Sequence, residues 1–212
     1  SAFRADITDL GLVSAGANLL TVEGLAFTKA NNGAGVLVIF DDGSEAATID
    51  LRDGLDLAFI NFPEPRKSTI LQTFNFAAAD VERTARLSMF FSSVAGSISG
   101  ADADRPTSIE VTVGGVKTIY SNLLASLDGE EWDTLNLDIL IPAGVTKLTV
   151  QAFSRDDNSS GYLPASFAWT AAGLSVPPPP PPPGGDGCTP GYWRNHLDSW
   201  PPTGYTPGDD FD

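Results

Sequence analysis

The sequence predicts an all-β protein, a two-sheet β-sandwich of jelly-roll type, followed by a polyproline linker and an extended aromatic C-terminal tail. Short segments rich in β-branched and aromatic residues recur between Gly, Asn and Asp clusters, whereas helical spacing of apolar residues is scarce. About a dozen such segments follow one another at intervals of roughly 8 to 15 residues, which is typical of sandwiches. Seven consecutive prolines, residues 177–183, end the series.

The predicted strands differ in how clearly their residues alternate. In residues 109–113 and 135–141 Ile, Val and Leu fall on one face with polar residues opposite, as a half-buried antiparallel sheet requires. The complete set of predicted strands spans residues 3–9, 19–27, 35–40, 47–50, 57–61, 68–75, 85–91, 108–113, 116–121, 132–141, 147–154 and 165–174.

Glycine-containing turns connect several of these segments. Asp42-Gly43 and Gly114-Gly115 each separate two strand-like runs and tolerate the positive φ of a hairpin turn. Residues 142–144, Pro-Ala-Gly, suit a tight connection between two late strands. One short helical segment is predicted over residues 122–126.

The proline run divides the chain into a β-sandwich domain (1–176), a Pro/Gly linker (177–187) and a docking tail (188–212). Seven prolines in polyproline II conformation form a stiff spacer of roughly 20 Å. The tail is too aromatic to remain solvated and too short for a core of its own, so it is expected to dock on a partner surface. Its candidate interface residues are Cys188, Tyr192, Trp193, Arg194, His196, Trp200 and Tyr205.

Composition excludes some partner classes. A net charge of −15 opposes binding to nucleic acid and to anionic lipid. No stretch has the roughly 18 apolar residues of a membrane span, so membrane insertion is not expected. The chain begins at Ser1 without an initiator Met, which indicates either a removed secretory signal or a trimmed chain. We therefore expect an extracellular or cell-surface protein.

No catalytic constellation is evident, and the chain is expected not to be an enzyme. Cys188 is the only cysteine and His196 the only histidine, and their spacing matches no common zinc site. Cys188 either pairs with another chain or attachment, or is an inert thiol. No cofactor is expected, although a structural calcium ion could use loop carboxylates; the alternative is that these are solvated turn residues. The calcium candidates are Asp102, Asp104, Asp156 and Asp157.

Two further features concern glycans. Asn158 begins an Asn-Ser-Ser glycosylation sequon in a predicted surface loop. Trp132, Trp169 and Tyr162 are candidates for stacking on sugar rings, but the two tryptophans also fit strand patterns and are expected in the core.

Two segments resemble known families. Residues 106–176, with VTVGGV, WDTLNLDILIPAGVTKLTVQAF and LPASFAWTAAGLSV, resemble the jelly-roll or galactose-binding-like β-sandwich modules of secreted bacterial proteins. The tail GCTPGYWRNH is similar to a CTPGYWKNH-type motif that follows low-complexity linkers in exported bacterial proteins, with Arg194 where Lys is commoner. These resemblances imply a sandwich fold and an exported protein.

Two functions fit these observations. The first is a secreted structural subunit that self-assembles into a homo-oligomer or homopolymer, such as a filament or surface layer. It would use its aromatic tail, a donated N-terminal strand, or both; Phe3, Ala5 and Ile7 share one face of such a strand. The alternative is a carbohydrate-binding or adhesive module of an exported system, with extracellular glycans as partners.

Overall fold

The structure is a computed structural model that describes residues 1–26, 28, 31–41, 47–94, 106–124, 131–179, 196–200 and 206. The chain divides into two compact units, residues 1–178 and 179–212. In the second unit the described residues include one turn of 3₁₀ helix, η3 (Leu197–Ser199), closed by a hydrogen bond of 3.0 Å from the Ser199 amide to the His196 carbonyl.

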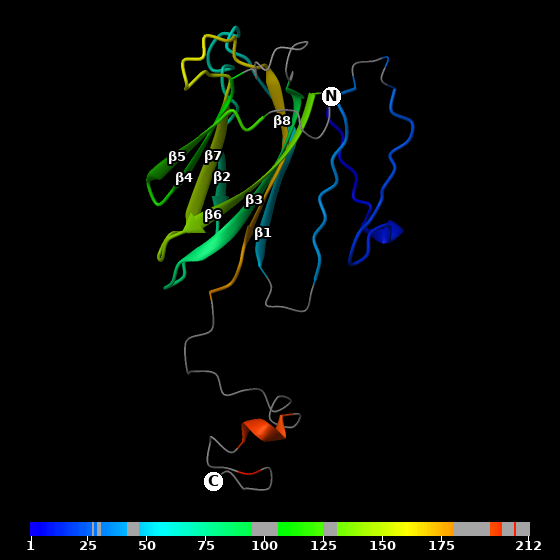
Figure 1. The fold of residues 1–212 in the computed structure, drawn as a ribbon, viewed down its shortest axis with the longest axis vertical. Coiled ribbons are helices and arrows are strands. Elements are labelled where there is room, and N and C mark those ends of the chain that lie inside the picture. Colours follow the sequence, from blue (N-terminus) through cyan, green and yellow to red (C-terminus); the bar gives the residue numbers. More distant parts are fainter. Residues whose placement is uncertain are drawn as a thin grey trace. The chain divides into compact units, whose positions relative to one another are not determined.

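The first unit is an all-β sandwich of two antiparallel four-stranded sheets, which confirms the predicted fold class (Figure 1). Sheet A has the strand order β1-β8-β3-β6, and sheet B has the order β2-β7-β4-β5. The strands are β1 (Thr48–Ala58), β2 (Gln72–Asn75), β3 (Arg83–Val94), β4 (Ser108–Val113), β5 (Val116–Ser121), β6 (Glu131–Ile141), β7 (Lys147–Phe153) and β8 (Phe167–Val176).

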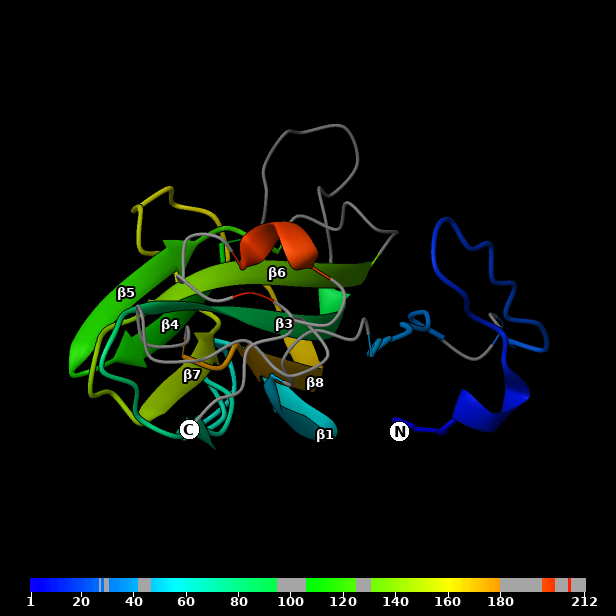
Figure 2. The same ribbon diagram turned by 90° about the horizontal axis from the view of Figure 1, so that it is seen from below.

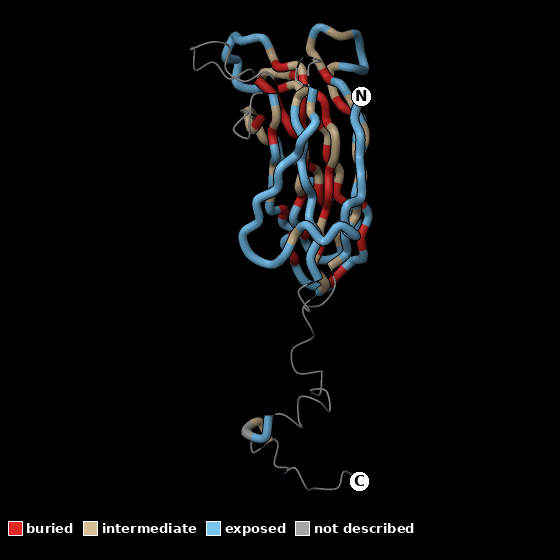
Figure 3. The backbone as a smooth tube through the Cα atoms, turned by 90° about the vertical axis from the view of Figure 1, so that its right-hand side faces the viewer, coloured by how far each residue is buried: buried red, intermediate tan, exposed pale blue. Residues whose placement is uncertain are grey.

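The core lies between the two sheets and follows the period-2 alternation of the strands. On β3, Leu87, Met89 and Phe91 are fully buried and face sheet B, where Val111 and Val150 are buried in turn. Buried positions therefore alternate with more exposed ones along the strands (Figure 3). Burying each such side chain contributes about 1.5 to 3 kcal/mol.

The later strand predictions are confirmed. β4 and β5 have the predicted bounds, and Gly114 (φ 56°) and Gly115 (φ 83°) form the turn between them. Positive φ at both central residues is the signature of a type I′ turn, whose twist matches the flanking strands. The predicted turn between β6 and β7 is also present, with Gly144 at φ 76° and its amide bonded to the Ala79 carbonyl at 2.8 Å.

The early strand predictions are wrong. The described residues of 3–9, 19–27 and 35–40 form no strand; the first of these ranges instead enters a 3₁₀ turn, η1 (Thr8–Leu10). Apolar alternation suits a strand but does not supply the hydrogen-bonding neighbour that a strand needs. Residues 47–50 and the start of 57–61 belong to one strand, β1, whose register shifts between Asp53 and Asp56.

The predicted helix over residues 122–126 is also wrong in its described part. Asn122 has φ 59°, which lies outside the right-handed helical region. Its amide donates to the Thr107 carbonyl at 2.8 Å, and its side-chain oxygen accepts from the Thr107 amide at 3.2 Å. The Asp42-Gly43 hairpin lies outside the described residues.

Residues 31–41 form a strap over the face of sheet A that points away from sheet B. Asn32 donates to Ser93 Oγ at 2.5 Å and to Glu131 Oε2 at 3.1 Å. A Cβ atom on Gly35 would lie 2.9 Å from the Trp132 ring, so only glycine allows the backbone to pass so close to the indole. The strap thus covers part of an apolar surface that the alternation of β3 and β6 would otherwise expose.

Candidate functional site

The buried side chain of Ser154 holds together the bases of two loops at one end of the sandwich. Both loops lie at the top of Figure 1. The Ile60 amide donates to Ser154 Oγ at 2.9 Å, and this oxygen donates in turn to the Ala165 carbonyl at 2.7 Å. The Ser154 amide donates to the Lys67 carbonyl at 3.0 Å. Residues 59–67 and 155–164 therefore meet on a fixed base at the end of β7. We call the exposed residues of these two loops, taken together, the paired-loop surface.

The first of these loops presents aromatic rings. Phe59 and Phe62 meet edge to face, with ring centroids 5.6 Å apart. The Arg66 guanidinium lies 5.4 Å from the centre of the Phe62 ring, a cation–π distance. The loop is closed by the Phe59 amide donating to the Arg66 carbonyl at 3.0 Å. Ring and guanidinium are thereby held next to each other at the surface.

The second loop is shaped by Asp156. Its carboxylate accepts from the amides of Asn158 and Gly161, both at 3.1 Å, and from Ser160 Oγ at 2.9 Å. Desolvation acts to raise the pKa of Asp156, but the hydrogen bonds from Ser160 and the loop amides outweigh it and lower the pKa. Tyr162, with 55% of its surface exposed, follows directly after this turn.

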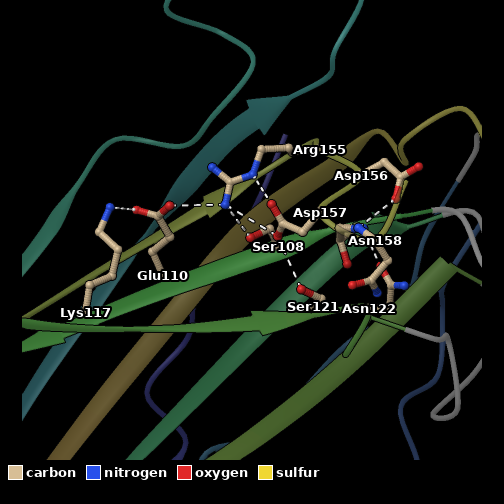
Figure 4. A network of polar contacts seen from close by, with 10 residues as sticks. Ser108, Glu110, Lys117, Ser121, Asn122, Arg155, Asp156, Asp157 and Asn158 are labelled. Carbon is tan, nitrogen blue, oxygen red and sulfur yellow. Dashed lines mark hydrogen bonds and ion pairs between the residues drawn. The ribbon is translucent and has the colours of Figure 1, made fainter. Parts of the chain in front are cut away.

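A network of charges connects the second loop to sheet B (Figure 4). Arg155 contacts Asp157 Oδ1 through Nε at 2.5 Å and Glu110 Oε1 through a terminal nitrogen at 3.1 Å. Lys117 Nζ reaches the other Glu110 oxygen at 2.5 Å. Ser121 Oγ donates to Asp157 at 3.2 Å. Two cations thus match two carboxylates, and the network holds the loop on β4 and β5.

The electrostatics of this network favour the charged forms. Desolvation acts to raise the pKa of Glu110, but its bonds with Lys117 and Arg155 more than compensate and lower the pKa. Desolvation also acts to raise the pKa of Asp157, but its hydrogen bonds, of which the one from Arg155 is the strongest, outweigh desolvation and lower the pKa. Desolvation acts to lower the pKa of Arg155, and its two carboxylate partners raise it. All three groups are therefore charged at neutral pH.

Two small crevices among the described residues each have a volume of about 10 Å³, about enough for one water molecule. Clefts that enclose a small organic ligand measure roughly 300 to 1,000 Å³. Chemically, the paired-loop surface can stack rings and exchange hydrogen bonds with a ligand that lies across it.

The sequence-predicted loop residues fall partly on this surface. Asp156 and Asp157 are committed to the internal bonds above, and no group of three or more metal-binding side chains occurs among the described residues. Asn158 lies exposed in the same turn, as its prediction as a surface sequon requires. Asp102 and Asp104 lie outside the described residues. Calcium binding and glycosylation stay predictions.

The two strand tryptophans differ in their surroundings. Trp169 is buried and belongs to the hydrophobic core, as expected. Trp132 is half-buried on the opposite face of sheet A, 5.8 Å from the Phe90 ring and beneath the strap. Neither tryptophan contributes to the paired-loop surface.

The predicted interface residues of the two termini are not brought together with this site. Phe3, Ala5 and Ile7 are exposed and pair with no strand in the described part of the chain. Of the tail residues, His196 is exposed and Trp200 half-buried. The rest, Cys188, Tyr192, Trp193, Arg194 and Tyr205, lie outside the described residues. Their role as anchors stays a prediction.

Comparisons with solved structures give matches with TM-scores of about 0.3. No family model and no curated protein matches the chain. A family 35 carbohydrate-binding module from Clostridium thermocellum is 18% identical with a TM-score of 0.30, over 50% of this chain and 69% of that one. An exo-β-1,3-galactanase from Phanerochaete chrysosporium, solved with galactose, is 10% identical with a TM-score of 0.30, over 61% and 29%.

A third similar structure is dimeric latent PorU from Porphyromonas gingivalis, which is 12% identical with a TM-score of 0.32, over 68% of this chain and 14% of that one. The chain thus spans under a third of the galactanase and of PorU. The likeness of the tail to an exported motif stays a prediction. No helix in the described part of the chain is long and apolar enough to cross a membrane.

Sequence reasoning missed the aromatic loop. Residues 57–61 were predicted as a strand because Phe59 and Ile60 have strong β propensity. The available signal was the pair of prolines at 63 and 65, which indicates a turn directly after Phe62 and so places that ring at the surface.

Proposed function

We propose that this chain is a carbohydrate-binding module of an exported system and that the paired-loop surface receives the glycan. The observation that carries the proposal is that exposed Tyr162 and half-buried Phe62 lie on two loops whose bases are both anchored at Ser154. Loops held by a rigid sandwich are common places for binding residues.

The chemistry of the surface suits a sugar. One face of a pyranose is lined by C–H groups and packs on an aromatic ring, while its hydroxyls need hydrogen-bond partners at the edge. Arg66 and Asn158 lie on the same two loops as Phe62 and Tyr162 and supply guanidinium and amide groups. An open surface accommodates the interior of a polysaccharide chain, which a closed pocket would exclude.

The charge of the site bears on the class of glycan. The chain has a net charge of −15, and the cations Arg155 and Lys117 are already paired with carboxylates. A strongly acidic polysaccharide would be repelled. Neutral polysaccharides are therefore the preferred ligands.

Binding is tested by depletion of the protein from solution by insoluble neutral polysaccharides, in parallel for the unchanged chain and for Tyr162→Ala. We expect the variant to lose at least ten-fold in affinity for whichever polysaccharide retains the unchanged chain. Leu140→Ala, which trims an equally exposed apolar side chain on β6, is the matched control and should bind normally. Equal retention of all three proteins would refute the assignment of this surface.

Self-assembly remains the second hypothesis. It is favoured by the large apolar side chains that stay exposed on β1 and on the N-terminal segment. The absence of an enzyme activity was likewise predicted and stays a prediction. An extracellular location is part of the proposal, because a module of an exported system meets its polysaccharide outside the cell.

A further inference from the structure

Strand β1 leaves an apolar face and a backbone edge uncovered. In the described part of the chain this eleven-residue strand pairs on one side only, with β8. Ile49, Leu51, Leu55 and Leu57 are each 40–48% exposed. A long edge strand with exposed aliphatic side chains is a template for pairing with another chain unless it is protected.

The N-terminal segment, residues 1–7, forms an ion pair with this strand. Arg4 contacts Asp53 Oδ1 at 2.8 Å, and both side chains are largely open to solvent. Figures 1 and 2 both place the segment (dark blue) on the side of β1. Phe3, next to Arg4, is nevertheless 95% exposed. Contact within one chain therefore leaves the apolar side chain of the segment unburied.

Charge on β1 is complementary to Arg4. The strand carries Asp50, Asp53 and Asp56 against one cation, Arg52. Arg52 forms an ion pair with Asp50 and donates a hydrogen bond to the Thr73 carbonyl at 3.3 Å. Asp56 accepts a hydrogen bond from a backbone amide in the connection between β1 and β2. Asp53 is the carboxylate of β1 that forms the ion pair with Arg4. In a chain of net charge −15, a cation aimed at this acidic strand is the kind of contact that offsets repulsion between copies.

We propose that β1 accepts the N-terminal segment, residues 1–7, of a second copy of this chain. The segment pairs along the free edge of β1, Arg4 of one copy binds Asp53 of the other, and Phe3 packs on the aliphatic face. The contact seen within one chain is thereby exchanged for the same contact between two, which is the principle of domain swapping. This interface uses a different face from the paired-loop surface and is independent of the proposed function.

The test uses the full chain in two forms, with Cys188, its only cysteine, changed to Ser in both. One form carries Arg4→Cys and the other Asp53→Cys. After mixing and brief treatment with a short thiol cross-linker, a heterodimer should form at least five-fold more than with the control pair Arg4→Cys and Lys117→Cys, because Lys117 lies on β5 of sheet B. Equal yields in the two mixtures would overturn the proposal.

Charge reversal provides the second readout. Arg4→Glu and Asp53→Arg should each raise the concentration needed for association, seen by light scattering, by roughly two- to five-fold, as expected for an exposed ion pair. The double variant Arg4→Glu/Asp53→Arg should restore association. A single monomeric mass for the unchanged chain and all three variants across the concentration range would reject the interface.

Discussion

Replacing Ser154 by Ala should lower the free energy of unfolding by about 2 to 3 kcal/mol. The Ser154 hydroxyl accepts from the Ile60 amide at 2.9 Å and donates to the Ala165 carbonyl at 2.7 Å, and the residue is 1% exposed. Each lost bond is worth about 1 kcal/mol net, and leaving a buried partner unsatisfied adds about 1 kcal/mol or more. Alanine removes both bonds without changing the backbone.

Urea unfolding followed by circular dichroism and tryptophan fluorescence measures this loss. The slope m should not change, because the surface exposed on unfolding is the same. Ser160→Ala serves as the control: its hydroxyl bonds to Asp156 at the surface, and its removal should alter stability by no more than about 0.5 kcal/mol. If the two variants differ by less than that amount, Ser154 does not fasten the loops and the reasoning is wrong.

Three further predictions concern the core, the strap and the charge network. Leu87→Ala should cost about 2 to 5 kcal/mol in the same unfolding assay, since the side chain is fully buried; a loss under 1 kcal/mol would contradict the assigned core. Gly35→Ala places a methyl group 2.9 Å from the Trp132 ring, so the strap should lift and tryptophan fluorescence shift to the red; an unchanged spectrum would contradict the close approach. Because its folded-state pKa is lowered, Glu110 stabilises the fold above its ordinary pKa of 4.5, and this contribution is lost as pH falls through the folded value. Glu110→Gln should therefore flatten the loss of stability in acid; an unchanged acid profile would show that the ion pairs contribute nothing.

The late strands were predictable because two local signals agreed. Apolar alternation on 109–113 and 135–141 coincided with turn glycines at 114 and 144. For β4 and β5 the turn also specifies the register, because these two strands pair with each other. Among the described strands, only β4 and β5 are both sheet neighbours and consecutive in the sequence, so the pairing of the others could not be predicted from nearby residues.

The N-terminal segments 3–9, 19–27 and 35–40 are also rich in apolar residues but form no strand in the described residues. Their propensity is local, whereas pairing depends on whether a sheet edge is available at the right place. The strap illustrates this: Gly35 lets its backbone pass over Trp132 and Phe90, and it contacts the face of sheet A rather than an edge. Face packing of an irregular segment leaves no periodic pattern in the sequence.

The candidate site was only partly accessible to sequence reasoning. Tyr162 and Asn158 could be placed in one surface loop from their neighbours. The anchoring of residues 59–67 next to the base of that loop depends on Ser154, a small polar residue whose partner Ile60 lies 94 residues away in the sequence. Such a long-range contact is invisible without coordinates.

The most direct test of the central claim is a map of amide chemical shifts, recorded by nuclear magnetic resonance on the ¹⁵N-labelled full chain during titration with soluble neutral oligosaccharides. Binding at the paired-loop surface predicts saturable shifts concentrated in residues 59–67 and 155–164, with little change on the distant ends of β3 and β6. Shifts centred elsewhere, or none with any oligosaccharide tried up to millimolar concentration, would contradict it.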